Sequence, residues 1–307
     1  MAYNEEANVG HLLDALGRQK LRDFALVEVI VVASGCTDRT AAVVKECAFR
    51  DPRIRLIVQE RREGKASAIN LFLGEARGEL LVLESADTLP RGDTLQRLLA
   101  PFADPEVGMT GARPYPVNRA RRFMGYSAHF FWWMHHNLAL VRPKLGEMVA
   151  FRRVVRAIPN DTAVDEAAIE AIVERAGYRI HYAEDAIVFN RGPETVRDYL
   201  TQRRRIVAGH LHLRRTQGYS VASRRYDIIV RNLARKLRDN VHLVRRLAQR
   251  RQKGFLKLYL RHHFVRALVI PVAVLMEIHA EALGAWDYLR GANPYVWPVA
   301  STTKRLR

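Results

Sequence analysis

Residues 80–90 read LLVLESADTLP, an apolar run that ends abruptly in acids and small polar residues. The apolar part, 79–83, predicts a short buried strand, and Asp87 follows its carboxyl end. Asp87 is therefore either an ordinary polar residue that ends a strand or a carboxylate that holds a metal ion. The segments on both sides of this stretch decide between these two interpretations.

Helix-like and strand-like segments alternate on either side of this stretch. Apolar spacing and composition predict helices over 8–21, 40–48, 66–76 and 95–102, and strands over 27–32, 54–58 and 79–83. Such alternation predicts a parallel sheet with crossover helices. Ligands bind beyond the carboxyl ends of such strands, where both Ser34-Gly35 and Ser85-Ala86-Asp87 fall. We therefore expect two turns far apart in sequence to meet in one crevice.

Further segments follow this alternating part. The expected elements are a loop over 113–118, an aromatic-rich stretch over 129–137, a strand over 148–151, a helix over 165–176 that Gly177 ends, short strands over 180–182 and 187–189, and an apolar helical stripe beyond Tyr226. The fold class is therefore α/β, followed by a mainly helical part.

The positive charge of the chain is concentrated in one segment. The net charge is +18, and residues 201–266 hold 19 Lys/Arg against two acids, which is +17. This cationic part should bind a polyanionic partner. The apolar run 267–276 has ten residues, and we expect it to be too short to cross a bilayer as a helix. Two cysteines exclude a disulfide framework.

Six short motifs carry the chemistry. They are Ala2-Tyr3-Asn4-Glu5-Glu6, the strand and turn over 31–40, the Gly64-Lys65 helix start over 63–70, Ser85-Ala86-Asp87, Asp165-Glu166, and Gln202-Arg203-Arg204-Arg205-Ile206. In this order they resemble the motifs of family 2 glycosyltransferases of the GT-A fold, including its Asp-x-Asp position and the Gln-x-x-Arg-Trp motif of membrane synthases. The resemblance implies a GT-A-like catalytic domain over 1–212, with a mostly parallel sheet, and a basic helical membrane-interface region over 213–307.

The resemblance also implies a role for each motif. The residues implied to bind the nucleotide sugar are Ala2, Tyr3, Glu5, Ser34, Lys65, Ser85 and Asp87, and those implied at the diphosphate or acceptor are Glu147, Gln202, Arg204 and Arg205. A departing diphosphate needs its charge neutralised, which a Mg²⁺ or Mn²⁺ ion on Asp87 would do. The acceptor hydroxyl needs a base, and either Asp165 or Glu166 would serve in an inverting reaction.

The sequence departs from the family pattern at three places. Neutral Ser34 and Ser85 stand where the family commonly has acids, so the donor base is open, with a UDP-sugar favoured. The acceptor-side motif reads Asp-Glu instead of Glu-Asp, so the identity of the base is open. The family's first strand precedes 2–6, so either the native start lies upstream or the sheet lacks an inner strand.

We therefore expect a metal-dependent inverting glycosyltransferase at the cytoplasmic face of the cell membrane, peripheral or monotopic. Its acceptor would be a lipid-linked glycan or a growing polysaccharide, and secretion of a product would need a membrane-protein partner. Two alternatives are a catalytically degenerate GT-A binding protein and a polyanion-binding scaffold. Nucleic acid is not an expected partner, because no helix-turn-helix, zinc or RNA-recognition signature is evident. The histidines of 135–136 and 210–212 are more typical of packing than of a metal site.

Overall fold

The computed structural model describes residues 1–221, 253–292, 295–296 and 301–303, together with positions 231, 234 and 238. The helices are α1 (Val9–Gly17), α2 (Thr40–Arg50), α3 (Lys65–Glu75), α4 (Thr94–Leu99), α5 (Phe123–Ala139), α6 (Asp165–Arg175), α7 (Val196–Gln217) and α9 (Lys253–Leu289), with short 3₁₀ turns η1 (Ala100–Ala103) and η3 (Ser301–Thr303). The strands are β1 (Val29–Ser34), β2 (Ile54–Gln59), β3 (Leu80–Glu84), β4 (Thr88–Pro90), β5 (Val107–Pro116), β6 (Met148–Arg152) and β7 (Arg179–Asn190). The helical stripe expected beyond Tyr226 lies outside the described residues.

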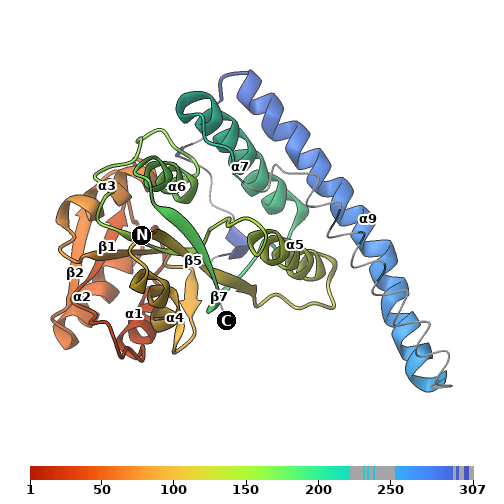
Figure 1. The fold of residues 1–307 in the computed structure, drawn as a ribbon, viewed down its shortest axis with the longest axis horizontal. Coiled ribbons are helices and arrows are strands. Elements are labelled where there is room, and N and C mark those ends of the chain that lie inside the picture. Colours follow the sequence, from red (N-terminus) through yellow and green to blue (C-terminus); the bar gives the residue numbers. More distant parts are fainter. Residues whose placement is uncertain are drawn as a thin grey trace.

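The strands form two sheets, with α7 and α9 lying beside the α/β body (Figure 1). β1 and β2 pair in parallel, as the alternation predicts. The second sheet has the order β3-β6-β5-β7-β4 and is mixed: β5 and β7 are parallel, and the other pairs are antiparallel. Within the described residues, the expected inner strand is represented by an isolated parallel bridge between Ala2 and Ala33.

The first two residues join the carboxyl ends of β1 and β3. The Ala2 amide donates to the Val32 carbonyl at 2.9 Å, and the Ser34 amide donates to the Ala2 carbonyl at 3.0 Å. On the other side, the Ala86 amide donates to the Met1 carbonyl at 3.1 Å. These bonds hold the two turns close together. The prediction that Ser34-Gly35 and Ser85-Ala86-Asp87 share one crevice is therefore confirmed.

The element predictions differ from the structure mainly in the second sheet. The loop expected over 113–118 is the end of β5, which continues to Pro116. The two short strands expected over 180–182 and 187–189 are one strand, β7, whose pairing with β5 shifts register between Ala112 and Arg113. The irregularity lets Glu184 and Asp185 stay exposed without ending the strand. The helix expected over 95–102 ends at Leu99 and continues as the η1 turn.

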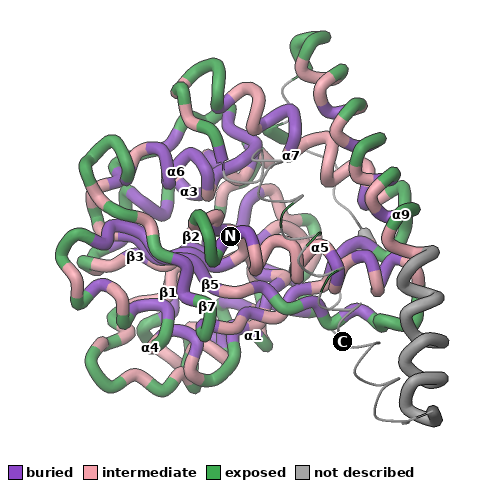
Figure 2. Tube along the Cα trace, turned by 45° about the vertical axis from the view of Figure 1, so that its right-hand side comes forward, coloured by how far each residue is buried: buried purple, intermediate pink, exposed green. Residues whose placement is uncertain are grey.

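Helices cover both faces of the second sheet. Phe151 of β6 belongs to one core cluster with Ile69 of α3 and Ile169 of α6. Its neighbour Met148 belongs to the cluster on the opposite face, with Leu98 of α4. Residues separated by an odd number along a strand face opposite sides, so β6 is apolar on both. Figure 2 shows the resulting buried centre. Because helices pack on both faces of the sheet, the position of its strands is fixed.

α9 is joined to α7 by two ion pairs. Arg203 forms a half-buried pair with Glu277, which also accepts a hydrogen bond from the Tyr199 hydroxyl. One residue further along α7, the more exposed Arg204 pairs with Asp287 at 2.7 Å. Removing one partner of the half-buried pair leaves a poorly solvated charge, so this contact helps to fix where α9 lies along α7.

The apolar run 267–276 is part of the longer helix α9, which continues through Pro271. The prediction that this segment is too short to cross a bilayer is therefore wrong, because it counted only the ten residues of the run. By length and composition, the 21 residues Val269–Leu289, with a mean hydropathy of 1.4, could cross a membrane. Exposed positions recur along α9 from turn to turn (Figure 2), and its exposed large apolar side chains are Val272, Leu275, Ile278, Trp286 and Leu289. This helix therefore presents an apolar face away from α7.

We predict that Gly284→Ala weakens the packing of α9 on α7. A Cβ at Gly284 would lie 2.6 Å from the Val207 Cβ and 2.8 Å from the Arg204 carbonyl oxygen, so the helices must move apart. Overpacking of this kind costs about 1–3 kcal/mol. Urea unfolding in detergent measures the free energy of unfolding. The control is Gly74→Ala in α3, where a Cβ would meet nothing within 4 Å. Equal stability of the two variants would contradict the described contact between α7 and α9.

Candidate active site

A cavity of about 890 Å³ opens at the carboxyl ends of β1 and β3 and extends to α9. Twelve of the residues that the sequence implies for the site line it: Ala2, Tyr3, Glu5, Ser34, Lys65, Ser85, Asp87, Glu147, Asp165, Glu166, Gln202 and Arg205. These side chains come from seven segments that are far apart in the chain. The cavity is therefore the place where the sequence motifs meet.

Lys65 joins two of these motifs across the cavity. Its Nζ lies 2.7 Å from an Asp165 carboxylate oxygen and 3.1 Å from a Glu166 carboxylate oxygen. Lys65 is the first residue of α3, and the two acids open α6, where carboxylates are favoured by the helix dipole. Gly64 precedes Lys65 with φ of +100°, a backbone conformation that favours glycine. The turn at Gly64 thus directs the lysine toward α6.

The two carboxylates of this group differ in their electrostatics. Burial, and then the adjacent Glu166, raise the pKa of Asp165. Burial also disfavours the charged form of Glu166, but Lys65 and nearby Arg205 outweigh it and lower the pKa of Glu166. The Glu166 side chain is 23% exposed and that of Asp165 only 6%. Glu166 is therefore the ionised carboxylate that a bound molecule can reach more easily.

A second carboxylate, Glu147, lies on the Asp87 side of the cavity. Its backbone has φ of +64°, and its carboxylate accepts a hydrogen bond from the Asn190 amide at 3.1 Å. Burial, and then repulsion from Asp87 and Glu166, raise the pKa of Glu147 to about 7. A glutamate held in this strained backbone indicates a constrained position. The neighbouring carboxylates make this side of the cavity electronegative.

These residues fit a divalent cation. Asp87 and Glu147 provide carboxylates, and the buried Oδ1 of Asn190 has no hydrogen-bond partner among the described residues. Carboxylate and amide oxygens are ligands of Mg²⁺ and Mn²⁺, which usually keep several positions for water and substrate phosphate. Within the described part of the chain, no three or more His, Cys, Asp or Glu side chains form a ready-made metal cage. The donor set thus suits a cation shared with a bound phosphate.

The arginine cluster of α7 divides between the cavity and α9. Gln202, Arg203 and Arg205 line the cavity, and Arg205 is buried near Asp165 and Glu166. Arg204 does not line it, because its guanidinium is paired with Asp287 of α9. The expectation that Arg204 contacts the diphosphate or acceptor is therefore corrected.

The end of the cavity near Tyr3 is ordered by side-chain contacts. The Arg62 guanidinium lies 4.2 Å from the centre of the Tyr3 ring, a cation–π contact. The Ser34 hydroxyl donates to the Gln59 side-chain oxygen at 2.6 Å. Glu5 accepts a hydrogen bond from the Asn8 side chain at 2.8 Å. Removal from water is the main cause that raises the pKa of Glu84 to about 8, and the charge of Asp87 adds to it.

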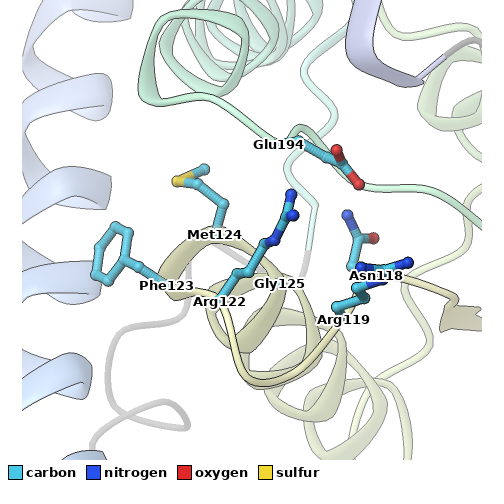
Figure 3. Close-up of a pocket in the computed structure, with 7 residues that line it drawn as sticks. All are labelled: Asn118, Arg119, Arg122, Phe123, Met124, Gly125 and Glu194. Atoms are coloured by element: carbon cyan, nitrogen blue, oxygen red, sulfur yellow. The ribbon is translucent and has the colours of Figure 1, made fainter.

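The other half of the cavity has an apolar wall from α5 and α9. Its apolar side chains include Met124, Phe130, Phe131, Trp132, Met134, Leu138, Val274 and Ile278. A smaller cavity of about 240 Å³ adjoins it at the start of α5, with Met124 lining both (Figure 3). In this smaller cavity, the Asn118 side-chain amide donates a hydrogen bond to the Gly192 carbonyl at 2.9 Å. Figure 3 shows the Arg122 side chain pointing toward the segment that carries Glu194.

Sequence reasoning missed several residues of the cavity. These are Arg62, Lys144, Asn190, Glu170, Arg203 and the α9 residues Glu277 and Glu281. Arg62 could have been found from its place just before the Gly64-Lys65 motif. Arg203 lies inside the Gln202–Ile206 motif but was not assigned to the site. The others carry no motif, because they come together only when the chain has folded. One histidine of each pair makes a polar contact with a neighbouring side chain. The His136 ring nitrogen hydrogen-bonds with the Tyr182 hydroxyl at 3.1 Å, and His212 lies 3.1 Å from an Asp161 carboxylate oxygen.

We predict that Glu170 makes stability fall as pH rises. One Glu170 carboxylate oxygen accepts from the Leu145 amide at 2.9 Å and the other from the Tyr219 hydroxyl at 2.9 Å, yet burial raises its pKa to about 7. A raised pKa favours the protonated folded state, so stability is full below about pH 4.5 and falls until about pH 7. The loss is at most about 3 kcal/mol.

Glu170→Gln removes this dependence while it keeps an oxygen and a polar group in place. We expect the variant to match the wild type near pH 5 and to exceed it in free energy of unfolding at pH 8. Urea unfolding at several pH values measures the difference. The control Glu46→Gln, on the exposed side of α2, should keep the wild-type slope. Parallel pH profiles for the wild type and Glu170→Gln would refute this account of Glu170.

Comparisons with known proteins agree on one kind of fold. The family described as "Glycosyl transferase family 2" matches residues 1–158, and the one described as "Glycosyl transferase family group 2" matches residues 80–289. A mannosyltransferase from Pyrobaculum calidifontis, solved with GDP-Man and Mn²⁺, has a TM-score of 0.65 and 22% identity, over 94% of this chain and 85% of its own. This likeness shows that the α/β part and its C-terminal helix form a GT-A fold.

Curated relatives match shorter stretches. An N-acetylglucosaminyltransferase of Rhizobium meliloti (strain 1021) is 26% identical over 201 residues, 58% of this chain and 47% of that relative. A dolichyl-phosphate beta-glucosyltransferase of Trichomonas vaginalis is 34% identical over 145 residues, 42% of this chain and 43% of that relative. The matched region thus spans about half the length of these relatives.

Proposed function

Because the chain belongs to glycosyltransferase family 2, we propose that it transfers a sugar from a nucleotide-sugar donor to a hydroxyl acceptor, with inversion and with the help of a divalent cation. The observation that supports this most is the single cavity that gathers Asp87, Lys65, Glu166 and Arg205 from segments far apart in sequence. Oppositely charged groups that surround one space suit a reaction in which a diphosphate leaves and a hydroxyl loses a proton.

In the proposed reaction, the nucleotide sugar lies with its base near Tyr3 and its diphosphate between Asp87 and Arg205. A divalent cation bound at Asp87 supplies charge neutralisation for the leaving diphosphate. Arg205 adds a planar guanidinium that can bind phosphate oxygens in pairs. Lys65 holds Asp165 and Glu166 at the cavity wall and brings a positive charge toward the same space.

The chemical step is a single displacement. The acceptor oxygen forms a bond to the anomeric carbon while the bond from that carbon to the diphosphate breaks. The bonding electron pair leaves with the nucleoside diphosphate, and the hydroxyl proton passes to a carboxylate. We assign this base to Glu166, because it is more exposed than Asp165 and its lowered pKa keeps it ionised. Asp165, paired with Lys65 at 2.7 Å, is a positioning residue.

The acceptor and the location are proposed from the other half of the cavity. Its apolar wall reaches Ile278 of α9, a residue that is also exposed on the outer face of that helix. An acceptor with an apolar portion could therefore reach the site from the α9 side. The exposed apolar face of α9 and the +17 charge of residues 201–266 support attachment to an anionic membrane surface. We place the enzyme at the cytoplasmic face, where nucleotide sugars are available to such a site.

We predict that Asp87→Asn abolishes metal-dependent release of nucleotide. The wild type in detergent, with Mn²⁺ or Mg²⁺ and a panel of nucleotide sugars, should release free nucleotide from one donor. Asp87→Asn should lower this rate by about 100-fold or more, because the carboxylate that holds the cation is lost. Asp23→Asn, at an exposed position, is the control. Absence of release from every donor with the wild type would favour a binding protein without catalysis.

We predict different kinetic effects for the two acids of α6. Glu166→Gln should lower kcat by about 10²- to 10⁴-fold and leave the donor KM nearly unchanged, because it removes the base only. Asp165→Asn should chiefly raise the donor KM, since Lys65 loses its closest partner. Steady-state kinetics with the donor found in the screen measure both. A larger kcat loss for Asp165→Asn than for Glu166→Gln would reverse the assignment of the base.

A further inference from the structure

A basic group lies in the apolar half of the cavity, away from the proposed donor site. Lys144 precedes β6, lines the cavity, and makes no hydrogen bond or ion pair with any described residue. Removal from water lowers the pKa of its ammonium to about 8, so it stays largely charged at neutral pH. The Lys144 side chain is half-buried, and an ammonium that is partly removed from water without a close anion is unfavourable. A bound anion would reduce this cost.

A second unused polar group faces the same space. His135 of α5 lines the cavity, and its Nδ1 is buried with no hydrogen-bond partner among the described residues. Burial, and then the charge of Lys144, hold the pKa of His135 well below its usual value, so the ring is neutral. A neutral imidazole can donate one N–H to an anion. Trp132 packs edge-to-face against the His135 ring, with 5.1 Å between the two ring centres, and adds an apolar wall.

Two of the three acids around Lys144 are engaged with other groups. The charges nearest to Lys144 are those of Arg203, Glu170, Glu277 and Glu281. Glu277 is paired with Arg203 and accepts from Tyr199, and Glu170 accepts from Leu145 and Tyr219. The raised pKa of Glu170 also reduces its negative charge at neutral pH. These acids therefore do not neutralise Lys144 by direct contact.

Helix α6 sets the spacing between this group and the proposed base. Glu170, which accepts from the Leu145 amide next to Lys144, is one helical turn after Glu166. Lys144 and Glu166 line the same cavity. One bound molecule could therefore present an anion to Lys144 and a hydroxyl to Glu166. On the other side, the apolar wall leads to Val274 and Ile278 of α9.

We propose that Lys144 and His135 form a phosphate-binding subsite for the acceptor, and that the acceptor is a sugar joined through phosphate to an apolar chain. The inference rests on the proposed function, and it assigns the phosphate, the sugar and the apolar chain of the acceptor to successive parts of one cavity. The phosphate lies between Lys144 and His135. The terminal sugar reaches Glu166, and the chain leaves along α5 toward the exposed face of α9.

The test is binding of farnesyl diphosphate, a simple molecule with the phosphate and the apolar chain but no sugar. The donor site is first saturated with nucleoside diphosphate and Mg²⁺, and binding is followed by calorimetry in detergent. We expect the wild type and Lys144→Arg to bind, and Lys144→Met to bind about 10- to 100-fold more weakly, because a charge-assisted contact is lost. The control Lys45→Met, on the exposed side of α2, should bind like the wild type.

Two further probes separate the possible sources of binding. Farnesol has the chain without the phosphate and should bind weakly and equally to the wild type and Lys144→Met. Inorganic pyrophosphate has no chain and should not displace farnesyl diphosphate at equal concentration. Affinity for nucleoside diphosphate reports whether Lys144→Met is folded.

Two results would overturn the inference: no binding of farnesyl diphosphate to the wild type, or equal binding to the wild type and Lys144→Met. Because nucleotide release from the donor is measured separately, either result would leave the proposed glycosyl transfer standing. Loss of nucleotide release from every donor would instead remove the proposed function itself.

Discussion

The contact of Lys65 with Asp165 and Glu166 is the interaction on which the site depends. It joins the start of α3 to the start of α6 across the cavity, at 2.7 Å and 3.1 Å. Two carboxylates side by side in a buried place repel one another, and the ammonium between them makes their coexistence possible. The same contact fixes α6, and with it Glu170 and the loop that holds Lys144 and Glu147. The acceptor half and the donor half of the cavity are thus set by one ionic group.

The cavity has three electrostatic parts that follow from the fold. The carboxyl ends of β1 and β3 bring Asp87 near Glu147, and this negative part suits a cation. The start of α6 and the middle of α7 bring Lys65 and Arg205 around Glu166, which suits a phosphate and a proton acceptor. The third part, between α5 and α9, is apolar with the isolated charge of Lys144. An extended substrate with both charged and apolar groups matches this order.

Much of the α/β part could be predicted from the sequence, because the β-branched runs and helix starts are local signals. Convergence of the Ser34 and Asp87 turns followed from the expected strand direction. The hydrogen bonds of Ala2 with Val32 and Ser34, and of Met1 with Ala86, hold the two turns together. The single strand β7 could not be predicted, because Glu184 and Asp185 interrupt the alternation and only pairing with β5 spans them. Likewise, the length of α9 could not be predicted, because charged residues bound the apolar run 267–276 without ending the helix.

For the site, the sequence indicated which residues take part better than it indicated where their side chains point. Arg204 and Arg205 are equivalent in the sequence, but the packing of α9 turns one to Asp287 and leaves the other in the cavity. Lys144 and His135 carried no motif, because their environment is made by four helices that meet late in the chain. The residues proposed to bind the donor are therefore easier to find by pattern than those proposed to bind the acceptor.

A crystal structure with a nucleoside diphosphate and Mn²⁺ tests the central claim most directly. The account predicts the base next to Tyr3, the manganese ion on the Asp87 carboxylate, and the diphosphate between that ion and Arg205, with Lys65 still joined to α6. The anomalous signal of manganese identifies the ion without ambiguity. Nucleotide bound elsewhere, or manganese in the cavity with no contact to Asp87, would contradict the account.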